Sequence, residues 1–104
     1  MGVTELEEAI QVLKSSGINS FEQAELFLSI AREPGRSMQE ISGNAAGTKE
    51  YGLVHNRLRS LEMGRRRSLA NGPGLVRFET RGSLYKVIKL SRKGMACIRK
   101  LKRI

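Results

Sequence analysis

A repeated polar signal for the start of a helix divides the first half of the chain into short segments and constrains its fold more than any other feature. Ser or Thr is followed three residues later by Glu or Gln at residues 4–7, 20–23 and 37–40. In such a capping box the hydroxyl accepts from a backbone N–H of the first turn, and the Glu or Gln side chain reaches back. Glycine or proline follows each segment, where helices end. The sequence therefore predicts a helix over about residues 4–16, a second from Ser20 to Pro34–Gly35, and a short third from Ser37 to Gly43.

A fourth and longer helix is predicted after the tight connection at residues 43–47, with Thr48 or the glycine before it as its cap. Gly52 lies inside this helix, where glycine costs about 1 kcal/mol relative to alanine, which indicates close packing or the close approach of a ligand. The expected buried face, spaced four and three residues apart, consists of Val54, Leu58 and Leu61.

The character of the sequence changes after this helix. Residues 63–74 form an irregular basic loop, and residues 75–79 and 84–90 alternate apolar and polar side chains around a glycine-containing turn. Ser91 then caps a last helix. Because a two-stranded hairpin alone is marginal in water, it must pack against the helices. The sequence predicts a mainly α-helical fold with one small two-stranded β-hairpin.

Charge is distributed unevenly along the 104 residues, whose formal net charge is +9. Residues 1–42 carry seven acidic and three basic side chains, whereas residues 43–104 carry sixteen basic and three acidic ones. Such polarity favours a surface turned toward a polyanion, most often the phosphates of a nucleic acid. A single cysteine, Cys97, excludes an internal disulfide, and no apolar run is long enough to span a membrane, so a cytoplasmic protein is expected. Cys97 itself is expected to be a small buried hydrophobe.

Enzyme signatures are missing from the sequence, and we expect no enzyme, no metal and no cofactor. The only histidine, His55, has no partner pattern for a metal or a nucleophile. The run at residues 43–49 resembles a phosphate-binding loop, but its spacing is one residue short, its Lys-Thr order is reversed, and no strand precedes it.

The order helix, helix, short helix, turn, longer helix, hairpin, helix resembles the winged helix-turn-helix proteins of the MarR type. Residues 38–42 resemble the helix before the turn, residues 54–62 the end of the recognition helix, and residues 74–77 the start of the wing. Residues 87–94 are similar to the family's Val-x-Leu-Thr-x-x-Gly, with Ser91 in place of threonine. The resemblance covers about residues 20–104. It implies one domain over residues 1–104, with an N-terminal helix at 1–17, the helix-turn-helix at 37–62, the wing at 75–90 and a C-terminal helix at 91–104.

The chain departs from the family pattern in two ways. About a dozen residues at 63–74 separate the recognition helix from the wing, where the family has two or three, and they either extend the helix or add a basic contact. The chain is also short, which leaves little for the long terminal helices of typical members. A compact regulator of the phage or plasmid type, or a partition-type DNA binder, fits that length.

The predicted DNA contacts follow from the chemistry of the groove. Asn56 suits the paired donor and acceptor of adenine, Arg59 or Lys49 suits guanine or a phosphate, and Tyr51 suits a thymine methyl or a phosphate. Arg81 resembles the wing arginine that enters the minor groove in this family. A solvated helix face is the plainer alternative for the helix residues, and a solvated charge run for the arginine cluster. The full predicted set is Thr48, Lys49, Glu50, Tyr51, His55, Asn56, Arg59, Arg65, Arg66, Arg67 and Arg81.

Apolar stripes on the first and last helices either complete the core or form an isologous dimer surface suited to palindromic sites. The resemblance favours a homodimer. The residues of this expected surface are Leu6, Ile10, Leu13, Met95, Ile98 and Leu101.

The sequence as a whole predicts a sequence-specific, double-stranded DNA-binding transcriptional regulator, acting as a dimeric repressor. Two other classes remain open. A winged helix also serves as a protein-interaction module or inhibitor, with the acidic first half as its docking face, and a partition or nucleoid protein coats DNA with little sequence preference.

Overall fold

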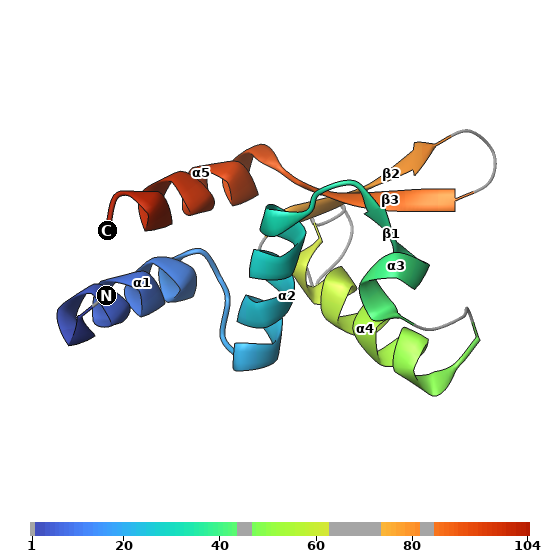
Figure 1. Ribbon diagram of the computed structural model, residues 1–104, viewed down its shortest axis with the longest axis horizontal. Helices are drawn as coiled ribbons and strands as arrows, with labels where there is room; N and C mark the ends of the chain where they lie inside the picture. Colours follow the sequence, from blue (N-terminus) through green and yellow to red (C-terminus); the bar gives the residue numbers. More distant parts are fainter. Residues whose placement is uncertain (1, 44–46, 63–73, 82–84) are drawn as a thin grey trace.

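The elements follow one another in the predicted order, with one strand added (Figure 1). The computed structural model describes residues 2–43, 47–62, 74–81 and 85–104, with the backbone alone at 80, 81, 85 and 86. This part of the chain is mainly helical with a small antiparallel sheet, as expected. The helices are α1 (Val3–Ser15), α2 (Phe21–Arg32), α3 (Met38–Ser42), α4 (Lys49–Leu61) and α5 (Arg92–Lys102), and the strands are β1 (Arg36–Ser37), β2 (Val76–Arg81) and β3 (Tyr85–Leu90).

Hydroxyl caps set the starts of four helices, as the sequence predicts. Ser37 and Glu40 form a reciprocal capping box, in which the Ser37 hydroxyl accepts from the Glu40 N–H at 3.2 Å and the Glu40 carboxylate accepts from the Ser37 N–H at 3.1 Å. Ser20, Thr48 and Ser91 accept in the same way from the residue three positions on. These bonds satisfy N–H groups that the first turn of a helix leaves without a partner.

The start of α1 differs from the prediction. The helix begins at Val3, so Thr4 lies inside its first turn and the expected box of Thr4 with Glu7 is wrong. Glu5 makes the equivalent bond two residues earlier, since its carboxylate accepts from the Gly2 N–H at 3.2 Å. Glu5 lies three residues after Gly2, just as Glu7 lies three residues after Thr4, so either carboxylate can reach back to a backbone N–H. The bond to Gly2 lets the helix begin earlier in the chain.

The sheet has three strands in the order β1-β3-β2, so the prediction of a two-stranded hairpin was incomplete. The hairpin pairs Phe78 with Ile88, and the two residues of β1 pair with the other edge of β3, Arg36 opposite Ile88 and Ser37 opposite Val87. A strand of two residues is too short to show alternation in the sequence. It covers the free edge of β3 and leads directly into the Ser37 cap of α3.

The core lies where α2, α4 and the sheet meet. Leu58 and Leu61 are fully buried, and Val54 is partly buried, which confirms the predicted inner face of α4. The predicted burial of Cys97 on α5 is also confirmed. The other fully buried large apolar side chains of the described residues are Phe27, Ile30, Leu75, Val76, Val87 and Ile88.

A tight junction joins the base of the hairpin to α5. The buried Ser91 hydroxyl donates to the Gly74 carbonyl and accepts from the Gly94 N–H, and the Ser91 N–H donates to the Leu75 carbonyl at 3.0 Å. A Cβ at Gly94 would collide with that Leu75 carbonyl. Gly94 is therefore required because two backbone segments approach each other closely.

Helices α1 and α5 lie side by side and extend away from α3, α4 and the sheet (Figure 1). None of the residues of α1 is buried. Of the six predicted dimer residues, Leu13, Ile98 and Leu101 pack partly against the core, whereas Leu6, Ile10 and Met95 are exposed. The apolar stripes therefore serve the core in part and leave apolar surface free in part.

Candidate nucleic-acid interface

The side of α4 turned away from the core carries the best candidate for a nucleic-acid interface. Lys49, Gly52, Leu53 and Asn56 recur three and four residues apart and so share one face of the helix. Lys49, Leu53 and Asn56 are exposed. We call these four residues the outer face of α4.

Gly52 leaves this face open. Apart from the backbone of its own helix, a Cβ built at Gly52 would meet no atom of the described residues within 4 Å, so packing against this part of the chain does not require the glycine. The other explanation that the sequence offered, the close approach of a ligand, stays a prediction. A backbone exposed by glycine lets a phosphate or a base edge come nearer to the helix than alanine would.

Leu53 belongs to the outer face and was not among the predicted contacts. Its side chain is 48% exposed in the middle of α4, one residue off the buried stripe. That position is the signal in the sequence: a large apolar residue outside the inner face of an otherwise polar helix. An exposed apolar side chain in a groove can contact the methyl group of thymine.

Tyr51 and His55 lie on a different side of α4 from Lys49 and Asn56. The Tyr51 ring is partly buried against the core and stacks on the His55 ring, with 6.4 Å between ring centroids. The His55 ring in turn meets Phe78 of β2 edge-on, at 6.1 Å. These rings join α4 to the hairpin. The predicted contacts Tyr51 and His55 are therefore not brought together with the outer face of α4.

The ends of α4 hold the other predicted residues. The Thr48 hydroxyl accepts from the Tyr51 N–H at 3.2 Å, so its role in the structure is that of a cap. Glu50 in the first turn and Arg59 in the last turn are both exposed. A base at the C-terminal end of a helix also stabilises it through the helix dipole.

The hairpin adds charge beside α4. Lys89 of β3 lies 3.0 Å from the Glu79 carboxylate of β2, and Arg77 lies 3.9 Å from the same carboxylate. Arg81 ends β2, where its backbone pairs with Tyr85, and its side chain is outside the described part of the structure. The predicted contacts Arg65, Arg66 and Arg67 also lie outside the described residues.

Not every basic side chain is free for a ligand. The Arg36 guanidinium donates to the Ser29 carbonyl at 2.9 Å and to the Ser29 hydroxyl at 2.7 Å, near the C-terminal end of α2. It therefore satisfies acceptors of a helix end. The other exposed bases of the helices include those of α5: Arg92, Lys93, Arg99, Lys100 and Lys102.

Neither a metal site nor a membrane span is found in the part of the chain that the structure describes. No group of three or more His, Cys, Asp or Glu side chains there could hold a metal ion. No helix there is long and apolar enough to cross a bilayer. Comparison with protein families, with curated proteins and with solved structures finds no match to this chain.

Proposed function

We propose that this protein is a double-stranded DNA-binding transcriptional regulator of the winged helix-turn-helix type, with α3 and α4 as the helix-turn-helix and the β2–β3 hairpin as the wing. The observation that carries the proposal is the outer face of α4. It combines an exposed cation, an exposed amide and a glycine on one side of the helix. The charged β2–β3 hairpin meets α4 on a different side, through Phe78 and His55.

Each residue of the outer face has a partner in the major groove, which is wide enough for an α-helix. The Asn56 amide matches the N6 and N7 groups of adenine, and Lys49 matches O6 and N7 of guanine or a phosphate. Leu53 supplies the apolar contact to thymine. Gly52 allows the helix backbone to come close to the duplex.

The distribution of charge supports a polyanionic partner. The segment from residue 43 onward holds sixteen of the nineteen basic side chains. Phosphate contacts position a protein on the duplex, and base contacts select the sequence. We assign Arg59, Arg77 and the wing arginine Arg81 to the first role and Asn56 and Leu53 to the second.

Repression is the regulatory outcome that requires the protein only to bind DNA. A small DNA-binding domain that occupies a promoter excludes other proteins from the same base pairs, and it needs no surface for recruiting them. We therefore assign the protein to repression by occlusion.

The proposal is tested by selecting bound duplexes from a random pool with the full chain and then measuring affinity for the enriched sequence. Asn56→Ala should relax the preference at one position by about 1–3 kcal/mol, and Lys49→Ala should lower affinity for the enriched sequence. Both side chains are exposed, so stability should stay close to wild type. Arg99→Ala on α5 is the matched control, since it removes an exposed base far from α4 and should change affinity less than Lys49→Ala.

The same experiment separates the other two classes of function. If the chain has no affinity for duplex DNA at low salt, the proposal is wrong and a protein-docking module is favoured. If it binds all sequences equally, a DNA-coating protein is favoured. Unchanged preference and affinity in both the Asn56 and Lys49 variants would overturn the groove-reading role of α4.

A further inference from the structure

Helix α5 and the residue that follows it carry a dense group of basic side chains that the proposed function does not use. Six of the twelve residues from 92 to 103 are basic, none is acidic, and all six bases are exposed. Helix α1, with its glutamates, lies beside α5, yet within the described residues no ion pair joins any of these bases to an acidic side chain. The six are Arg92, Lys93, Arg99, Lys100, Lys102 and Arg103.

Three of these arginines form a stripe that faces away from the core. Cys97 is buried and Leu101 is partly buried against the core, so these two residues mark the inner side of α5. Arg92, Arg99 and Arg103 are spaced seven and four residues apart, which places them together on the opposite side of the helix. We call these three arginines the outer stripe of α5.

The stability of α5 alone does not explain where these charges lie. Arg92 and Lys93 occupy the first turn, where the helix dipole disfavours a cation, and no acidic side chain in that turn offsets them. Arg99 and Arg103 are four residues apart, a spacing at which like charges repel each other. Only the bases of the last turn gain from the dipole. A polyanion bound along the stripe would replace both repulsions with favourable contacts.

The backbone of DNA fits this surface better than an anionic membrane does. A helix that binds a membrane buries its apolar side among the lipids. In α5 that side already packs against the core, and Met95 is its one exposed large apolar side chain. The 11 residues of α5 extend over about 16 Å. A duplex of that length carries about ten negative charges.

The outer stripe of α5 is separate from the outer face of α4. Helix α5 lies in one half of the long dimension of the molecule, which is 44 Å, and α4 lies in the other half, beyond α2 (Figure 1). Both surfaces point away from the core, since each lies opposite the buried side of its own helix. The stripe is thus placed to hold a DNA segment other than the one read by α4.

We propose that the outer stripe of α5 binds the phosphate backbone of a second DNA segment, so that the protein bridges two duplexes. Arginines on phosphates position a protein without reading bases, so the second segment can have any sequence. The proposal rests on the proposed function, because α4 must hold the first segment. Bridging brings the site that α4 reads next to another part of the DNA.

The test uses the full chain saturated with its unlabelled, enriched duplex. This complex is titrated into a fluorescently labelled duplex of unrelated sequence, and anisotropy measures binding of the second duplex. Wild type should bind it. Arg92→Gln combined with Arg99→Gln should reduce the steepness of log affinity against log salt by about 1.8, the value for two phosphate contacts. This variant should fold, because both side chains are exposed and glutamine is a good helix former.

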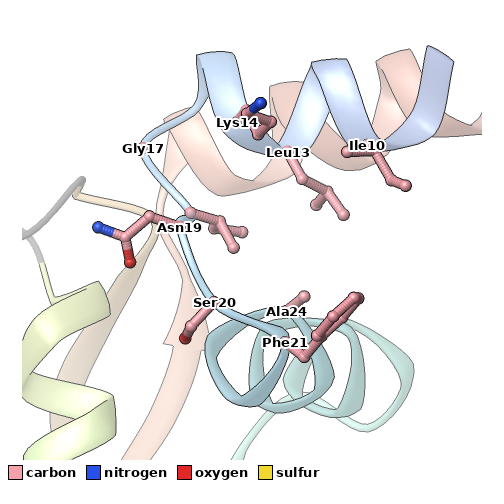
Figure 2. Close-up of a pocket in the computed structure, with 9 residues that line it drawn as sticks. Ile10, Leu13, Lys14, Gly17, Asn19, Ser20, Phe21 and Ala24 are labelled. Atoms are coloured by element: carbon pink, nitrogen blue, oxygen red, sulfur yellow. The ribbon is translucent and has the colours of Figure 1, made fainter. Parts of the chain in front are cut away.

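Lys14→Gln combined with Arg32→Gln is the matched control, since it lowers the net charge by the same amount. Both side chains are exposed and neither belongs to the outer stripe. Arg32 lies in the last turn of α2, and Lys14 lines an open apolar cleft between α1 and α2 (Figure 2). The control should keep the salt dependence of wild type. Equal molar masses in sedimentation equilibrium exclude a change in self-association as the cause of any difference.

Four results would overturn the proposal. If the saturated chain does not bind the labelled duplex, there is no second segment. If the α5 variant has the salt dependence of wild type, the contact lies elsewhere. If that variant weakens binding of the enriched duplex as much as binding of the labelled one, both helices contact the same segment. If the chain prefers phosphatidylcholine vesicles that contain phosphatidylserine to the labelled duplex, α5 is a membrane surface.

Failure of the proposed regulator gives a different result. In that case selection enriches no sequence, and the variants of Lys49 and Asn56 bind DNA as wild type does. The labelled duplex is then titrated with the free chain. A weaker salt dependence in the α5 variant would still support the outer stripe as a backbone contact, whereas an unchanged one would overturn it.

Discussion

Two glycines illustrate how much one residue depends on its surroundings. Gly52 and Gly94 both lie inside helices, where glycine is a poor choice by intrinsic propensity. Among the residues that the structure describes, a Cβ at Gly52 would meet no atom outside its own helix, whereas a Cβ at Gly94 would collide with the Leu75 carbonyl. The sequence alone gives no basis for separating the two, because the difference arises from a segment that lies far away in the chain.

We therefore expect opposite effects from the same substitution. Gly52→Ala should raise the free energy of unfolding by about 1 kcal/mol, because alanine is the better helix former and has room there. Gly94→Ala should lower it, because two backbone segments must move apart. Urea unfolding of the two variants measures both changes. A stabilised Gly94→Ala variant would contradict the close approach at the base of the hairpin.

Ser91 is the third residue whose substitution has a defined expected result. Ser91→Ala removes the cap of α5 and leaves the Gly74 carbonyl without its hydroxyl donor. The loss of a cap together with a buried hydrogen bond should lower the free energy of unfolding by about 1–3 kcal/mol. Ser91→Thr retains the hydroxyl and should lose less. Ser15→Ala, which removes an exposed hydroxyl, is the control and should change stability by less than about 0.5 kcal/mol.

At the scale of elements, a contact between aromatic rings joins α4 to β2. His55 bridges the Tyr51 ring and the Phe78 ring, and Phe78 is paired with Ile88 within the hairpin. Replacing the His55 ring should therefore change how much the Phe78 ring contributes to the free energy of unfolding, and the reverse.

A double-mutant cycle of His55→Ala and Phe78→Ala should give a coupling energy in the range of about 0.5–1.5 kcal/mol, the value found for aromatic pairs beyond simple burial. Thermal or urea unfolding supplies the four free energies. Asn56→Ala combined with Phe78→Ala is the control pair and should be additive, since Asn56 is exposed on the outer face. If the effects of His55→Ala and Phe78→Ala on the free energy of unfolding are additive, the contact between the two rings does not contribute to stability.

The sequence was sufficient for most elements because their limits are set locally. Ser37 with Glu40, Thr48 and Ser91 each fix a helix start by bonds that span three residues. Strand β1 was missed, since a pair of residues acquires strand geometry only through its distant partner β3. The same reason applies to the candidate site: helical spacing identifies Lys49 and Asn56, but it does not reveal that the His55 ring meets Phe78 of another element.

At the scale of the whole molecule, the uneven charge predicts a strong dependence of DNA binding on salt. Each phosphate neutralised by a basic side chain releases counterions, so affinity falls as salt rises. Contacts to six to ten phosphates would lower affinity by roughly 10³–10⁵ between about 50 and 200 mM salt. Fluorescence anisotropy with a labelled duplex measures the slope. A flat response would contradict an electrostatic interface.

Strand β1 links two of the parts of the molecule that we propose to touch DNA. Its residues Arg36 and Ser37 form the outer strand against β3, and Ser37 also starts α3. A chimera that receives the hairpin of another protein would therefore have to import a compatible dipeptide at positions 36–37 as well. Without it, the transplanted hairpin would lose its lateral support, and the short helix that follows would lose its orientation relative to the graft.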